Sequence, residues 1–200
     1  MVPVILKLVI ETWEQMPQIM PDAKEDKVTE SLCKALKQNR TARDLPFQIH
    51  IQMVELEPAN DEKLGRMDIA FLPLINREDV YFCLECKRLN VANGSGVRTY
   101  ASEYVRFGML RFIRGQYSKT VKHGAMSAYV LDGNTSSAIQ NVESNIQINH
   151  QELGMSPPGS FQPSTVLTGD ARARETHHKR VHDNSAFCIH HLFMPRKDAA

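Results

Sequence analysis

The sequence predicts a mixed α/β (α+β) domain, in which helices flank a central sheet. Three observations support this fold class. Two segments with helical spacing of apolar residues come first, three segments with alternating or apolar character follow, and helical and strand-like segments then alternate. At 200 residues the chain is long enough for one domain with a full core.

Two helices are predicted in the first part of the chain. Apolar residues recur at helical spacing over residues 4–16, and this segment stops at Pro17. A second helix is predicted over residues 23–39, because its apolar residues form one buried stripe, namely Val28, Leu32, Ala35 and Leu36.

The hydrophobic period changes to two at Phe47, which indicates strands. They are predicted at residues 47–53, 66–72 and 80–87, and their short connections make them a three-stranded meander. The rest of the chain predicts a flexible loop at 90–96, a helix at 99–112, a strand at 125–131, a helix at 136–150, a loop at 154–170 and a final strand at 187–194.

Composition excludes several classes of protein. The net charge of +1, from 24 basic and 23 acidic side chains, excludes a polybasic protein that coats DNA. The longest apolar run is far shorter than the ~20 residues of a membrane span, and no signal peptide is recognised. A cytoplasmic protein outside the membrane is expected, with reduced, mostly buried thiols at Cys33, Cys83, Cys86 and Cys188.

Charged residues inside apolar strands mark the candidate site. Asp68 lies within the strand at 66–72, and Glu85 and Lys87 lie two apart within the strand at 80–87. Side chains two apart in a strand share a face, so Glu85 and Lys87 project side by side. If the two strands are hairpin neighbours, Asp68 lies beside Glu85. Charges inside a central strand are costly unless they are paired or bind a metal ion.

Two carboxylates and an ammonium group suit metal-assisted hydrolysis. Oxygen ligands suit Mg²⁺, which one or two protein carboxylates usually hold. Such an ion polarises a phosphoryl oxygen and lowers the pKa of a bound water, and a nearby lysine orients that water or stabilises charge on the phosphate. The alternative is an ordinary ladder of salt bridges on an exposed sheet face.

Asp68 followed by Glu85-Cys86-Lys87 resembles the D…ExK signature of the PD-(D/E)XK nuclease superfamily, which has the restriction-endonuclease-like fold. The order of a helix, three strands, a helix and a strand also fits this family, across residues 23–131. Met67 stands where the family often has a proline. The resemblance implies one nuclease domain over residues 1–200, in which the segments at 1–16 and 151–194 elaborate that core.

The resemblance also implies a metal site. Asp68 and Glu85 would bind Mg²⁺ or Mn²⁺, with the backbone carbonyl of Cys86 as a further ligand. In the family a glutamate of the first core helix often joins them. Glu30 is the candidate because it lies in the middle of that helix, and Glu25 is a second one.

The activity implied by the resemblance is hydrolysis of phosphodiester bonds by a DNA endonuclease. Lys87 would act on the water or the phosphate, and Gln116 is carried over as a further catalytic polar residue. Defence against phage or other foreign DNA is an implied context. A double-strand cut implies a homodimer or a partner subunit.

A basic stretch follows the motif. Residues 98–123 carry six basic side chains against the single acid Glu103, whereas residues 1–62 carry seven bases and eleven acids. A local basic stripe is what phosphate contacts need. The alternative is that these cations only solvate the outer face of a helix. A second basic stretch, at 172–182, is either a further grip on a duplex or a solvated loop. The predicted DNA contacts are Arg98, Arg106, Arg111, Arg114, Lys119 and Lys122.

A zinc site is not predicted from the cysteines or the histidines. Cys83 and Cys86 are three apart in a strand, so their thiols point to opposite faces. The histidines show no evident Cys or Glu partner; they are His177, His178, His182, His190 and His191. Of the adjacent pair His190 and His191, one is expected to pack inward and the other to face water.

Two other functions stay open from the sequence. A non-catalytic subunit with a nuclease fold would bind nucleic acid or a partner protein within a larger assembly. RNA or a free nucleotide is the alternative substrate, because the motif does not distinguish either from DNA.

Overall fold

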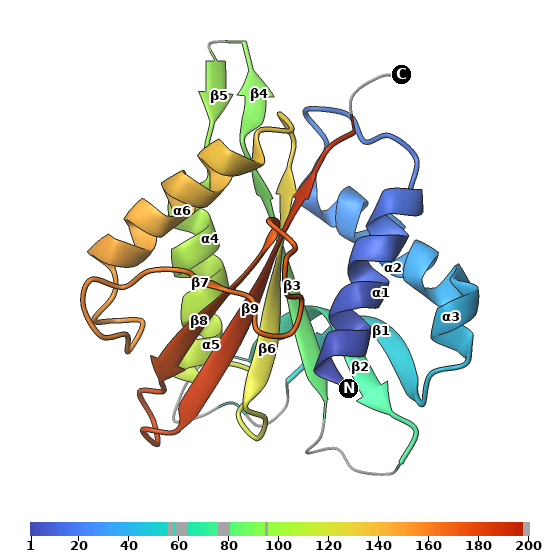
Figure 1. Cartoon of the computed structure of the whole chain (residues 1–200). Coiled ribbons are helices and arrows are strands. Elements are labelled where there is room, and N and C mark those ends of the chain that lie inside the picture. The colour runs from blue at the N-terminus through green and yellow to red at the C-terminus, as the bar shows by residue number, and fades with distance from the viewer. Residues whose placement is uncertain (56–57, 59–63, 76–80, 95, 198–200) are drawn as a thin grey trace.

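The computed structural model describes residues 1–55, 58, 64–75, 81–94 and 96–197. These residues form a mixed α/β structure in which helices cover both faces of a seven-stranded sheet (Figure 1). The strands lie in the order β1, β2, β3, β6, β9, β8, β7. Their bounds are β1 Phe47–Val54, β2 Arg66–Pro73, β3 Phe82–Leu89, β6 His123–Val130, β9 Ala186–Pro195, β8 Ala173–Lys179 and β7 Gln162–Pro163.

The sheet has two antiparallel sides and a parallel centre. Strands β1, β2 and β3 form the antiparallel meander that the sequence predicts. Strand β6 runs parallel to β3, and β9 runs parallel to β6, while β8 and β7 return antiparallel. Most side chains of the parallel strands are buried, because helices cover both faces of a parallel sheet.

Two groups of helices cover the sheet. Helices α1 (Val2–Gln15), α2 (Glu25–Gln38) and the short α3 (Arg40–Arg43) pack on one face. Helix α4 (Ala101–Tyr104), a π-helical segment η1 (Val105–Met109), α5 (Leu110–Arg114) and α6 (Thr135–Ile148) pack on the other. Cys86 belongs to the first core and Cys83 to the second, so the predicted opposite orientation of these thiols is confirmed.

Three local features differ from the sequence predictions. The helix predicted at 99–112 has π geometry in its middle, between α4 and α5. The loop predicted at 90–96 is a hairpin of β4 (Val91–Asn93) and β5 (Gly96–Arg98), with Ser95 outside the described residues. The basic stretch at 172–182 contains strand β8. Val80, the predicted start of the third strand, also lies outside the described residues.

The adjacent histidines of β9 correct a further prediction. His190 is 2% exposed and His191 is 0% exposed, so neither faces water. Their strand lies between β6 and β8. A strand inside a sheet that is covered on both sides buries both of its faces, which alternation of residue types alone does not reveal.

Candidate active site

The meander brings Asp68 and Glu85 to neighbouring positions. Strands β2 and β3 pair with Ile69 opposite Leu84, so the next position along places Asp68 opposite Glu85. At that point Oδ2 of Asp68 accepts a hydrogen bond from the backbone N–H of Cys86 at 2.7 Å. The side chain of Asp68 is therefore fixed against β3 just beyond the last paired residues of the two strands.

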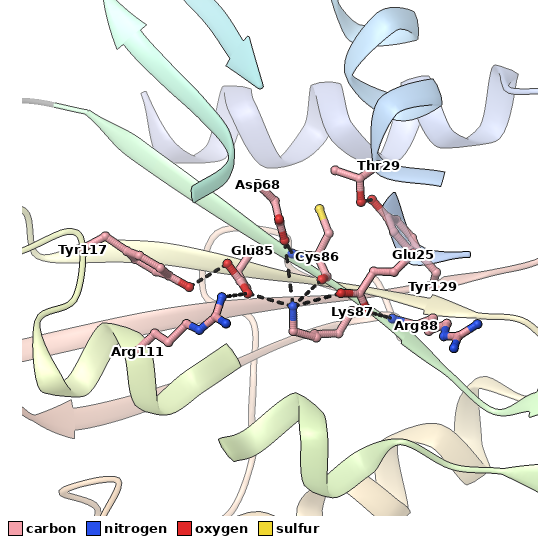
Figure 2. Close-up of polar contacts among 10 residues, drawn as sticks. All are labelled: Glu25, Thr29, Asp68, Glu85, Cys86, Lys87, Arg88, Arg111, Tyr117 and Tyr129. Carbon is pink, nitrogen blue, oxygen red and sulfur yellow. Dashed lines mark hydrogen bonds and ion pairs between the residues drawn. The ribbon is translucent and has the colours of Figure 1, made fainter. Parts of the chain in front are cut away.

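The ammonium group of Lys87 lies at the centre of the cluster (Figure 2). Its Nζ is 2.8 Å from Oε1 of Glu85, 3.1 Å from Oε1 of Glu25 and 4.0 Å from Oδ2 of Asp68. It also donates a hydrogen bond to the carbonyl of Cys86 at 2.9 Å. Three carboxylates and one carbonyl therefore surround a single cation position, which Nζ fills.

Glu85 is fully buried on the central strand β3. Arg111 donates from Nη1 to its Oε1 at 3.0 Å, and the Tyr117 hydroxyl donates to its Oε2 at 2.6 Å. Lys87 completes the set of partners. A buried carboxylate is strongly destabilising unless it is paired in this way. The two oxygens of Glu85 are thus held in defined directions, from different elements of the fold.

The pKa values of the cluster depart from those of free side chains. Burial and, after it, the charge of Glu85 raise the pKa of Asp68 to about 7. Lys87 is buried as well, but the carboxylates of Glu85, Glu25 and Asp68 outweigh this burial and raise its pKa. At neutral pH Lys87 is therefore a cation, and Asp68 exchanges its proton readily. A second cation near Asp68 would favour its ionised form.

Glu25, and not Glu30, is the helix carboxylate at the cluster. Glu30 is exposed, and its Oε2 accepts a hydrogen bond from Lys27 at 2.8 Å. Glu25 opens α2, where Oε1 contacts Lys87 and Oε2 accepts the backbone N–H of Arg88 at 3.0 Å. Residues five apart on an α-helix differ by roughly 140° around its axis, so the two carboxylates point in different directions. The structure corrects the predicted position accordingly.

Gln116 lies beside the cluster in the sequence, but the contact with Glu85 comes from Tyr117. Gln116 is half-buried, and its backbone N–H donates to the carbonyl of Arg111 at 3.0 Å. A catalytic role for Gln116 stays a prediction. The sequence predicts no role for Tyr117 and only a DNA contact for Arg111. The sequence signal for Tyr117 and Arg111 is that both belong to the basic and aromatic segment after the motif.

The six predicted DNA contacts have different surroundings. Arg111 belongs to the cluster. Arg98 pairs with Glu103 at 2.6 Å, and Arg114 pairs with Glu152 at 3.6 Å. The other three are exposed, and within the described part of the chain they form no ion pair with a carboxylate; they are Arg106, Lys119 and Lys122. Contact with DNA stays a prediction for all six.

An open cleft of about 510 Å³ borders the cluster. The cluster residues Glu25, Lys87 and Arg111 form part of its lining. Phe107, on the π-helical segment, also lines it with a side chain that is 58% exposed. The remaining lining residues are Lys24, Asp26, Arg88, Tyr100 and Glu103. The cleft gives the cluster access from solvent and offers cations and an aromatic face beside it.

Comparison with known proteins assigns no family to this chain. A scan against family models, a search of curated proteins and a search of solved structures each found no match. No helix among the described residues is both long enough and apolar enough to cross a membrane. The resemblance to PD-(D/E)XK nucleases therefore stays a prediction.

Proposed function

We propose that this chain is a metal-dependent DNA endonuclease, which hydrolyses phosphodiester bonds with a restriction-endonuclease-like core. The observation that supports this most is the convergence of Asp68, Glu85, Glu25 and the Cys86 carbonyl around one cation position. All four groups offer oxygen as the ligand atom, which Mg²⁺ and Mn²⁺ prefer. The residues present therefore fit such an ion.

In this proposal the carboxylates are the ligands of the metal ion. Asp68 and Glu85 bind the ion, and Glu25 and the Cys86 carbonyl complement them. Tyr117 and Arg111 orient the buried Glu85 by donating hydrogen bonds to its two oxygens. When bound, the ion would polarise a phosphoryl oxygen and lower the pKa of a bound water.

Lys87 has a separate role as a charged hydrogen-bond donor. In the ion-free protein its carboxylate neighbours raise its pKa, so it is a cation there. Its ammonium fills the position that the ion would take, so ion binding requires the side chain to turn aside. Lys87 lines the cleft, where its ammonium would contact a phosphate oxygen or the attacking water.

The cleft supports a polyanionic substrate. Arg88, Lys24, Arg111 and Lys87 line it against three acids, and this excess of cations would attract the phosphate backbone without regard to base sequence. The exposed ring of Phe107 offers a surface on which a base can stack. Arg106, Lys119 and Lys122 are further exposed cations, which a nucleic acid could contact outside the cleft and a free nucleotide would not need.

One observation favours a second function. The ammonium of Lys87 already neutralises the carboxylates around it, so the cluster is satisfied without a metal ion. This arrangement fits a non-catalytic subunit that binds nucleic acid or a partner protein. The two functions differ in whether the chain hydrolyses a phosphodiester.

The test is cleavage of plasmid DNA, single-stranded DNA and RNA with and without Mg²⁺. We expect Mg²⁺-dependent cleavage of DNA by the wild type, and a loss of at least ~100-fold in Asp68→Ala, Glu85→Gln and Lys87→Ala. Glu30→Gln is the matched control and should keep the wild-type rate. Equal activity of all variants would remove the proposed site, and preferential cleavage of RNA would change the substrate.

A further inference from the structure

A second group of metal-ligating side chains lies on the other face of the sheet. Strand β6 begins with His123, which pairs with Cys188 of β9, and Ala125 two residues later pairs with His190. On β3, Glu85 pairs with Met126. Residues alternate between faces along a strand, so His123 and its neighbours point away from the face that carries Glu85. This group is therefore separate from the carboxylate cluster.

The three ligand atoms are close enough to share one ion. Nδ1 of His123 and Nε2 of His190 are 3.2 Å apart, and Sγ of Cys188 is 3.7 Å from that Nε2. All three atoms lie within 4.8 Å of one another. Tetrahedral Zn²⁺ with its usual bond lengths sets N···N at about 3.3 Å and N···S at about 3.6 Å. We propose that His123, Cys188 and His190 form a Zn²⁺ site, with a water as the fourth ligand.

A buried carboxylate lies on the far side of the His190 ring. His190 is 2% exposed, and its Nδ1, which would not bind the ion, has no hydrogen-bond partner among the described residues. The nearest carboxylate oxygen is Oε2 of Glu175, 4.0 Å away on β8. Glu175 is itself held by Thr165 and His177. A zinc-bound histidine usually donates its second N–H to such a carboxylate, so a small turn of the ring would complete a carboxylate–histidine–zinc arrangement.

The residue types agree with zinc better than with Mg²⁺. One thiol and two imidazoles suit a borderline-soft ion, whereas Mg²⁺ prefers oxygen. A zinc ligand is a thiolate, so binding forms the Zn–S bond and the thiol of Cys188 releases one proton to solvent. His123 is exposed, which leaves room for the water.

The competing account is a hydrogen bond between two neutral histidines beside a buried thiol. It explains the distance of 3.2 Å, and the same small turn of the His190 ring toward Glu175 is open to it. It also predicts no affinity for Zn²⁺ above that of scattered surface histidines. A measurement of Zn²⁺ affinity therefore distinguishes the zinc site from the hydrogen-bonded histidine pair.

The experiment is titration of the chelator-treated full chain with Zn²⁺ and with Co²⁺. We expect one ion per chain to bind with a thiolate-to-cobalt charge-transfer band and tetrahedral Co²⁺ bands, and the unfolding temperature to rise in the presence of Zn²⁺. Cys188→Ser should lose the charge-transfer band, and His123→Gln should bind at least about tenfold more weakly. His123 is exposed, so its variant decides the matter if Cys188→Ser fails to fold.

Two variants serve as controls. Cys33→Ser removes a buried thiol outside the group and should leave the cobalt spectrum unchanged. Asp68→Asn removes a carboxylate of the other cluster and should also leave it unchanged. A wild-type spectrum without a charge-transfer band, or the same band in Cys188→Ser, would overturn the proposal.

Discussion

Asp68 is a carboxyl group whose surroundings favour its protonated form. Burial raises its pKa from 3.8 to about 7. Between these values the folded protein holds a proton that the unfolded chain has released, so the free energy of unfolding falls as the pH rises through this window. Each pKa unit corresponds to about 1.4 kcal/mol. An ionised Asp68 therefore destabilises the ion-free protein at pH 8.

We expect Asp68→Asn to stabilise the ion-free protein at pH 8 by roughly 2–4 kcal/mol, following that conversion. The asparagine keeps an oxygen that accepts the N–H of Cys86 and carries no charge. At pH 4 the two proteins should be nearly equal. Urea unfolding in a chelating buffer at pH 4, 6 and 8 measures the difference. A variant that is less stable than the wild type at pH 8 would contradict this account of Asp68.

Lys87 allows ion binding and catalysis to be separated at one residue. Its ammonium competes for the position between Glu85 and Asp68. We expect Lys87→Met to bind Mn²⁺ at least as tightly as the wild type, while DNA cleavage falls by at least ~100-fold. Calorimetry and a cleavage assay on the same preparation give both values. Loss of Mn²⁺ binding in Lys87→Met would show that Lys87 builds the ion site instead of competing with it.

Helix α2 offers a matched pair of carboxylates on one element. Glu25 contacts Lys87 and the backbone of Arg88, whereas Glu30 pairs with Lys27 in solvent. We expect Glu25→Gln to lower the affinity for Mn²⁺ and the cleavage rate by about tenfold, the loss of a single weak ligand. Glu30→Gln should change neither. Equal losses in both variants would point to the helix as a whole and not to the position of Glu25.

Helices and strands are predictable from the sequence where the local pattern of apolar residues matches the burial that the fold imposes. The stripe of α2 and the alternation in β1 identify their elements directly. Strand β8 was missed because its residues Ala173–Lys179 are mostly polar. Its buried side chains gain their partners from β9 and the segments packed on it, which are distant in the sequence. The π geometry of η1 likewise depends on packing against the sheet and has no local signal.

The candidate site was predictable in part for the same reason. Asp68, Glu85 and Lys87 are recognised because charges stand inside apolar strands and their spacing places them on one face. Two partners of Glu85, Arg111 and Tyr117, come from the segment after β5, so their contact depends on the complete fold. Glu25 and Glu30 look alike in the sequence, and only the packing of α2 against β3 separates them.

On the scale of the whole molecule, the near-zero net charge conceals an uneven distribution. Three exposed cations after the motif, Arg106, Lys119 and Lys122, form no ion pair with a carboxylate within the described residues. We expect Lys119→Glu with Lys122→Glu to weaken DNA binding and to reduce its dependence on salt, since each lost phosphate contact lowers the slope by about 0.9. Lys34→Glu, an exposed position on α2, is the control. Unchanged affinity in the double variant would exclude these lysines from the interface.

The two proposed ion sites lie on different strand pairs of one sheet, β2 with β3 and β6 with β9, and are expected to act independently. Oxygen donors form one, and a thiol with two imidazoles forms the other. Variants of Asp68 should therefore leave Zn²⁺ binding unchanged, and variants of His123 should leave Mg²⁺-dependent cleavage unchanged.

The central claim is that the carboxylates around Lys87 hold a divalent ion. Calorimetric titration of the ion-free full chain with Mn²⁺ tests it most directly, with His123→Gln as the common background so that the second site does not contribute. The account predicts one binding event that Asp68→Asn abolishes and Glu30→Gln preserves. Absence of binding, or binding of equal affinity in Asp68→Asn, would contradict it.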